Sequence, residues 1–252
     1  MSDASDARPA VSDALYAAIL ADPDDLGLRL RYADAVEPTD PDHAELIRLQ
    51  IEPVNAPRLI RLERRVGPRI AAPVAGFVAA WRVNLGFVDS VTMSGSAFVE
   101  HGERVLSRAP VRHLVLTDVA GHLPAIAASG LLDRLVGLDL GHNPIGDDGL
   151  SVLLGAAALP RLRWLGLAGC GIGPVGAERL AATSALPNLR YVDFRDNLVA
   201  VTAFPVGEDI DGSPVHVELP EFGRSLVDRY GPLPWLSLDW GERWLGVGYD
   251  EV

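Results

Sequence analysis

Lysine is absent from the 252-residue sequence, so all 22 basic residues are arginines. Without a lysine ε-amino group the chain cannot form a lysine Schiff base or supply the lysine of a P-loop. The single cysteine, Cys170, cannot form a disulfide within the chain, which favours a reducing compartment. No basic segment followed by an apolar run opens the sequence, so we expect a cytoplasmic protein rather than a secreted one.

Long apolar runs are also missing. The most apolar stretch, residues 70–81, is about half the length that spans a bilayer, and it contains Pro73 and Gly76. This stretch is interpreted as a buried segment, and no membrane association is expected.

Positive charge is in the minority, since 34 acidic residues outnumber 22 arginines and give a formal net charge of −12. A surface of this sign repels phosphate, so we expect no nucleic-acid partner. Between residues 57 and 85, however, Glu63 is the only acid in a run of arginines: Arg58, Arg61, Arg64, Arg65, Arg69 and Arg82. We interpret this run as a solvated helix face that balances acidic neighbours.

The strongest positive signal is an internal repeat between residues 111 and 197. Four segments share the frame L-x-x-L-x-L, and they begin at Val111, Leu135, Leu162 and Leu189, spaced by 24, 27 and 27 residues. Three of them continue to an asparagine or cysteine three residues past the frame, at Asn143, Cys170 and Asn197. This spacing is typical of leucine-rich repeats.

The pattern has a physical reason. Side chains alternate along a strand, so the last two apolar positions of each frame face inward. The asparagine or cysteine turns inward where the chain leaves the strand, and its polar group can satisfy backbone groups of the adjoining loop. Glycines and apolar residues at helical spacing follow. One repeat cannot bury its apolar face alone, so we predict an α/β leucine-rich-repeat solenoid, a curved parallel sheet with outer helices.

The 27-residue unit resembles the ribonuclease-inhibitor type of leucine-rich repeat, and the first 50 residues resemble the bacterial repeat-companion domain that precedes such repeats. Ala35 and Val36 stand where that family usually has Trp-Leu. The resemblance implies association with repeat scaffolds and no catalytic motif. The matching positions are Ile19, Leu20, Asp22, Pro23, Asp24, Arg29, Leu30, Tyr32, Ala33, Asp34, Glu37, Glu45, Ile47, Arg48, Leu49 and Gln50.

Three regions are expected. Residues 1–85 form a helical repeat-companion and N-terminal cap region, with helices over residues 13–21, 25–36 and 41–51. Residues 86–200 carry the repeats. Residues 201–252 form an irregular C-terminal cap with a helix over residues 220–230 and an acidic tail, whose tryptophans either cover the last repeat or form a secondary docking segment: Trp235, Trp240 and Trp244.

Catalytic and metal-binding signatures are not found. The histidines lack zinc-binding spacing, and no nucleophile motif or phosphate-binding loop is present. We therefore expect no metal, no cofactor and no enzyme. Cys170 occupies the position that follows the strand in its repeat, so it is interpreted as a buried structural thiol.

The sequence predicts a binding surface on the concave face of the repeats. Trp164 and Tyr191 occupy the same position in successive repeats, where strands lie about 5 Å apart. An aromatic pair near charged residues has the composition of an interface centre. The alternative left open is that the C-terminal segment folds back over one or both rings. The predicted binding residues are Trp164, Tyr191, Asp139, Asp193, Arg195 and His113.

The function expected from these features is a non-catalytic scaffold or adaptor that binds a protein or peptide. A second hypothesis is an accessory subunit that presents a substrate peptide to a modifying or biosynthetic enzyme. A third, less favoured, is an enzyme that uses Asp139, Asp193, Arg195 and His113. The sequence leaves the partner and the oligomeric state open.

Overall fold

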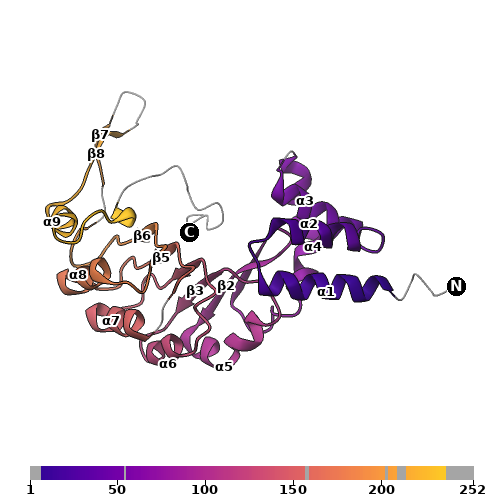
Figure 1. The fold of residues 1–252 in the computed structure, drawn as a ribbon, viewed down its shortest axis with the longest axis horizontal. Coiled ribbons are helices and arrows are strands. Elements are labelled where there is room, and N and C mark those ends of the chain that lie inside the picture. The colour runs from indigo at the N-terminus through magenta and orange to yellow at the C-terminus, as the bar shows by residue number, and fades with distance from the viewer. Residues whose placement is uncertain (1–6, 54, 157–158, 202–203, 209–213, 237–252) are drawn as a thin grey trace. The chain divides into compact units, whose positions relative to one another are not determined.

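The computed structural model describes residues 7–53, 55–156, 159–201, 204–208 and 214–236. It divides into two compact units, Met1–Met93 with Glu100–Val115 and Ser94–Val99 with Leu116–Val252. Both contain helices and strands, so the fold is mixed α/β (Figure 1). Among the described residues no helix has the length and apolar character needed to cross a membrane.

The first unit opens with four helices, α1 (Ala7–Ala21), α2 (Leu26–Val36), α3 (Pro41–Ile51) and α4 (Ala56–Ala71). Three of them begin after a residue whose side chain accepts a hydrogen bond from a backbone N–H of the first turn: Asp25, Asp40 and Asn55. Such caps satisfy N–H groups that a helix start leaves unpaired. The three helices predicted before residue 52 are confirmed.

The arginines of α4 that face α3 form ion pairs with it. Arg58 contacts Glu45, Arg65 contacts Asp42, and Arg69 Nη2 lies 2.7 Å from Asp40 Oδ2. Arg61 and Arg64, on other sides of α4, are exposed. The arginines of the run that lie on α4 therefore form a solvated helix face that balances acidic neighbours, as predicted, whereas Arg82 lies on β1. Exposed pairs of this kind contribute roughly 0–1 kcal/mol each to stability.

Strands β1 (Ala80–Asn84) and β2 (Phe87–Ser94) form an antiparallel hairpin whose two-residue turn is Leu85–Gly86. Both turn residues have positive φ, 50° and 83°, as the tight turns that match strand twist require. Strand β3 (His113–Thr117) follows along the chain, and its residues up to Val115 belong to this unit. Helix α5 (Gly95–Leu106) connects β2 to β3.

The hairpin turn sits on α2 and α3. Arg29 donates from Nη1 to the Leu85 carbonyl at 2.9 Å, and His43 Nε2 lies 2.7 Å from the Gly86 carbonyl oxygen. The Gly86 N–H donates to Gln50 Oε1 at 2.7 Å. Backbone polar groups that the turn buries are thus paired with side chains of the helices.

Phe87 anchors the core beneath this turn. Its ring contacts those of Tyr16, Tyr32 and His43 at centroid distances of 5.7, 5.2 and 5.5 Å. The guanidinium carbon of Arg29, a fully buried residue, lies 5.1 Å from the same ring centroid. Burial lowers the pKa of Arg29 to about 10, so this side chain stays charged at neutral pH.

In the second unit β4 (Gly137–Asp139), β5 (Trp164–Gly166) and β6 (Tyr191–Asp193) are neighbours in this order and pair in parallel. The helices α6 (Leu123–Ala128), α7 (Gly146–Ala156) and α8 (Pro174–Ala182) alternate with these strands along the chain. They pack against each other in chain order along one side of the strands (Figure 1). Each repeat therefore contributes one strand and one helix, as predicted.

The frame positions of the repeats form the core of this unit. Leu138, Leu140, Leu165 and Leu167 are each no more than about 1% exposed, and Val192 and Phe194 are also buried. Full burial of such a side chain contributes roughly 1.5–3 kcal/mol to folding. The inward orientation predicted for the last two apolar positions of each frame is confirmed.

The polar position after each strand forms a ladder between repeats. Asn143 donates to the carbonyls of Leu116 and Leu140 at 2.8 and 2.9 Å, and its Oδ1 accepts from the Val119 N–H. Asn197 repeats this arrangement one unit later, because it donates to Leu167 and Phe194 and accepts from Ile172. Between them the Cys170 thiol donates to the Leu140 carbonyl at 3.1 Å. The predicted backbone-satisfying role is confirmed.

The residue before the ladder position has a left-handed backbone in every repeat. Asp118, His142, Gly169 and Asp196 have φ values of 52°, 61°, 62° and 57°. Aspartate and histidine tolerate this region better than most side chains. The repeated conformation turns the next residue inward, which is how each asparagine or cysteine reaches two carbonyls.

The described part of the C-terminal region begins with a hairpin of β7 (Phe204–Glu208) and β8 (Pro214–Glu218). Helix α9 (Glu221–Tyr230) confirms the helix predicted over residues 220–230 and packs against α8, where Arg229 Nη1 lies 2.7 Å from Glu178 Oε1. The short 3₁₀ helix η1 (Pro234–Leu236) lies against β6, and both Trp235 and Leu236 are buried.

Candidate functional site

Trp164 and Tyr191 lie side by side on neighbouring strands. They are register partners between β5 and β6, and Gly137 is the partner of Trp164 on β4. Both aromatic residues are half-buried, whereas Leu165 and Val192 on the opposite side of the strands are buried. The aromatic pair predicted from the repeat spacing is therefore in register on the side of the sheet away from the leucine core.

Gly166 provides the space beside Trp164. A Cβ atom on Gly166 would lie 2.6 Å from Cη2 of the Trp164 indole and would overlap the Asp139 carboxylate. The indole and the carboxylate therefore both lie over Gly166, and an added methyl group there would force them to shift. Gly166 is the register partner of Asp139 on one side and of Asp193 on the other. We call these side chains of β4–β6 the Trp164 surface: Gly137, Asp139, Trp164, Gly166, Tyr191 and Asp193.

Asp139 is buried, and its Oδ1 accepts a hydrogen bond from the Gly141 N–H at 2.8 Å. This bond closes the turn that follows β4, so the carboxylate has a structural role in addition to its place on the Trp164 surface. His142, the residue after Gly141, is exposed and packs over Gly169 of the next repeat.

Asp193 and Arg195 form a bidentate ion pair at the end of β6. Arg195 donates from Nε and Nη2 to the two carboxylate oxygens at 2.9 and 2.7 Å. Burial acts to raise the pKa of Asp193, but the hydrogen bonds and charge of Arg195 together outweigh it. The pKa of Asp193 therefore lies below its usual value. The Arg195 side chain is 70% exposed, so an oriented guanidinium borders the Trp164 surface.

His113 belongs to the first unit, where it is buried beside Asp89. Its Nε2 lies 3.6 Å from Asp89 Oδ2, and Asp89 Oδ1 accepts a hydrogen bond of 2.6 Å from Arg112 Nε. The pKa of His113 is lowered to about 4, chiefly by burial and also by the Arg112 charge, against the opposing effect of Asp89. The imidazole is therefore neutral at physiological pH.

Of the predicted C-terminal docking residues, Trp235 is 5% exposed, which favours the end-cap interpretation for this side chain. Trp240 and Trp244 lie outside the described residues. The Cys170 thiol is buried, and burial raises its pKa to about 11, as expected for a structural cysteine. No group of three or more potential metal ligands occurs within the part of the chain that the structure describes.

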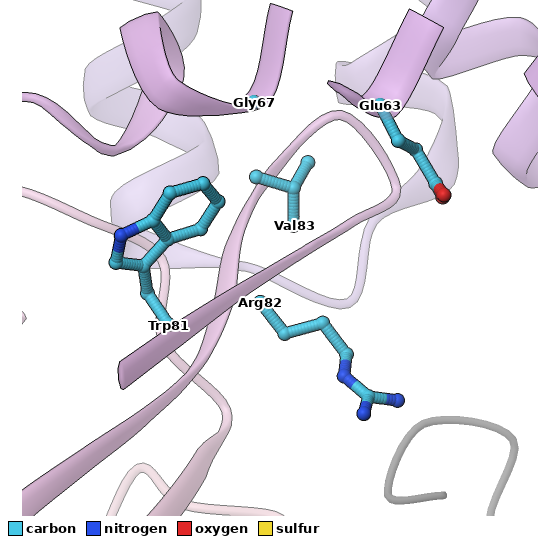
Figure 2. A pocket seen from close by; sticks show the side chains of 5 residues that line it. All are labelled: Glu63, Gly67, Trp81, Arg82 and Val83. Carbon is cyan, nitrogen blue, oxygen red and sulfur yellow. The ribbon is translucent and has the colours of Figure 1, made fainter. Parts of the chain in front are cut away.

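A pocket that the sequence interpretation did not include lies in the first unit between α4 and β1 (Figure 2). It has a volume of about 300 Å³ and is lined by Glu63, Gly67, Trp81, Arg82 and Val83. We call it the α4–β1 pocket. The sequence feature that could have indicated this pocket is Gly67 inside an arginine-rich helix. An interior glycine weakens a helix and marks a close approach or an unfilled space.

Comparison with known proteins gives one family match. A family model described as Leucine Rich repeat matches residues 135–154, which cover β4 and most of α7. No match was found among curated proteins or among solved structures. The matched segment contains the buried Leu138 and Leu140 and the ladder residue Asn143. The match and the strand–helix units around it support a leucine-rich-repeat protein.

Proposed function

We propose that this protein is a non-catalytic adaptor that binds a protein or peptide on the Trp164 surface. The observation that carries the proposal is the register of Trp164 with Tyr191, two half-buried aromatic side chains beside an exposed guanidinium. Aromatic and arginine side chains dominate the binding energy of protein interfaces. Leucine-rich repeats generally mediate protein binding, which agrees with this role.

The finer architecture is part of the same proposal. The repeats form a solenoid of the ribonuclease-inhibitor type in a bacterial cytoplasmic protein, residues 1–85 act as its companion and N-terminal cap, and residues 201–252 cap the other end. Stacked repeats need an end that does not expose their core. The burial of Trp235 beside β6 supports such a cap.

The ionisable groups of the site agree with a non-catalytic role. The Asp193 carboxylate is held by Arg195 in its own turn, and Asp139 accepts from the backbone of its own turn. The neutral His113 belongs to the other compact unit. A general base needs a proton donor of the substrate within hydrogen-bond reach and a suitable pKa, and both carboxylates are engaged in local structure.

The test compares partner capture by wild type, by Trp164→Ala/Tyr191→Ala and by the charge reversal Arg195→Glu. The matched control is Val152→Ala/Val175→Ala, which removes two exposed apolar side chains from α7 and α8. Proteins captured from the native cytoplasm are identified by mass spectrometry, purified, and titrated against each variant by calorimetry.

For a partner of the Trp164 surface, the aromatic double variant weakens binding by about 30-fold or more, since two interface hot spots are removed. Arg195→Glu also weakens binding, and its melting temperature is measured alongside because the change removes the ion pair to Asp193. The control binds like wild type. A purified partner that binds all four proteins with equal affinity would falsify the assignment of the site.

A further inference from the structure

The α4–β1 pocket has one apolar wall and a polar rim. Trp81 and Val83 point from β1 toward Gly67 of α4, whereas Arg82 points away from the helix (Figure 2). A Cβ atom on Gly67 would lie 3.4 Å from the Trp81 ring, an ordinary van der Waals distance, so the helix backbone approaches the indole closely at Gly67. A volume of about 300 Å³ accommodates one aromatic side chain.

Strand β1 also presents backbone groups to a partner. In the described residues it is at the end of its sheet and pairs only with β2. The Val83 carbonyl accepts a hydrogen bond of 3.3 Å from Gln50 Nε2 on the side away from β2. The register shift between Arg82 and Val83 puts its extra residue on β2, so backbone groups still alternate along β1. Trp81 therefore directs its N–H and C=O to the side away from β2, where Gln50 already occupies the Val83 carbonyl.

Two charged groups flank this edge. Glu63 Oε1 accepts a hydrogen bond of 2.7 Å from Gln50 Nε2, and its second oxygen has no donor among the described residues. The Arg82 side chain is exposed, and its guanidinium makes no hydrogen bond or ion pair within the part of the chain that is described. An acceptor on the pocket wall and a cation on the opposite face of β1 are therefore both available to a ligand.

We propose that this edge binds an extended peptide segment, which adds a strand beside β1, places a tyrosine in the α4–β1 pocket and sets an adjacent acidic residue against Arg82. Side chains of an added strand alternate between the two faces of the sheet. A residue that enters the pocket on the face of Trp81 and Val83 has neighbours on the face of Arg82. The alternation thus requires the anchor and the acid to be consecutive.

Tyrosine fits the pocket better than an aliphatic anchor because it satisfies both parts of the lining. Its ring packs on the Trp81 indole, and its hydroxyl can donate to the oxygen of Glu63 that has no donor among the described residues. The negative neighbour complements Arg82, as opposite charges on facing strands do. The site uses residues of the first unit only, so it is a second interaction surface and does not depend on the Trp164 surface.

The test uses blocked synthetic peptides of alternating threonine and valine around a central Tyr-Asp, Tyr-Lys or Ala-Asp pair, titrated into the full chain. Binding is followed by fluorescence anisotropy of labelled peptide and by amide chemical shifts of β1. For wild type we expect the Tyr-Asp peptide to bind, the Ala-Asp peptide to bind about tenfold more weakly, and the Trp81 and Arg82 amides to shift.

Charge reversal distinguishes the proposed pairing from nonspecific attraction. Arg82→Glu should reverse the preference, so that Tyr-Lys binds several-fold better than Tyr-Asp, and it leaves the fold intact because the position is exposed. Arg61→Glu, an exposed arginine of α4 outside the pocket, is the matched control and should keep the wild-type order. The proposal is overturned if no peptide shifts the β1 amides at millimolar concentration, or if Arg82→Glu leaves the preference unchanged.

Discussion

Gly86 packs directly against Ile47, so closely that a Cβ atom at Gly86 would overlap the Ile47 side chain. The contact joins the β1–β2 turn to α3, and the same turn is held by Arg29, His43 and Gln50. This tight turn is therefore one of the contacts that join the preceding helices to the hairpin, and a side chain at residue 86 would not fit it.

Replacement of Gly86 by alanine should destabilise the protein. The residue has a φ of 83°, which strains any L side chain, and the added methyl group collides with Ile47. We expect the free energy of unfolding to fall by about 2–4 kcal/mol, measured by chemical denaturation. Gly76→Ala is the control, because nothing lies within 4 Å of its added methyl group. Equal stability of the two variants would contradict the packing described here.

The asparagine ladder makes a second prediction. Asn143→Ala removes hydrogen bonds to the carbonyls of Leu116 and Leu140 and leaves the Val119 N–H without its acceptor. Buried unpaired groups cost about 1–3 kcal/mol each, so we expect a loss of about 3 kcal/mol or more in denaturant titrations. Asn188→Ala, which removes one exposed bond to the Pro160 carbonyl, should cost less than about 1 kcal/mol. A loss no greater than that of the control would rule out a structural ladder.

His113 should make stability depend on pH. Its folded-state pKa of about 4 lies below the ordinary value of 6.5, so the unfolded chain binds this proton more readily than the native one. Stability is therefore fully present above pH 6.5 and decreases as pH falls toward 4. Between pH 7 and pH 5 the loss attributable to this group is about 2 kcal/mol.

The measurement for this prediction is the free energy of unfolding of wild type and His113→Gln across that pH range. The variant lacks the imidazole, so its stability relative to wild type should rise by the same amount between pH 7 and pH 5. Parallel curves for the two proteins would show that His113 titrates alike in the folded and unfolded states.

Cys170 should be chemically inert in the folded protein. Burial excludes reagents and raises the thiol pKa to about 11, so almost no thiolate is present at neutral pH. We expect no reaction with Ellman's reagent in native buffer and release of one equivalent per chain in concentrated guanidinium chloride. Rapid native labelling would mean that the repeat opens around this position.

The repeat could be predicted from the sequence because its signal is periodic. Leucines at fixed spacing require a strand with one buried side, and an asparagine or cysteine three residues later requires carbonyls to bind. The structure confirms both through Leu138 and Leu165 in the core and through Asn143 and Cys170 in the ladder. The register of Trp164 with Tyr191 follows from the same period.

Contacts between segments distant in sequence were decided by the tertiary structure alone. Arg29 is 56 residues from the Leu85 carbonyl that it binds, and the local sequence does not show which carbonyl this would be. The α4–β1 pocket likewise exists because Gly67 of a helix meets Trp81 of a strand. Local sequence determined the repeated strands and helices, since the spacing of their apolar residues indicates which side of each element is buried. Which buried polar groups meet, and where space remains between elements, depends on how those elements pack.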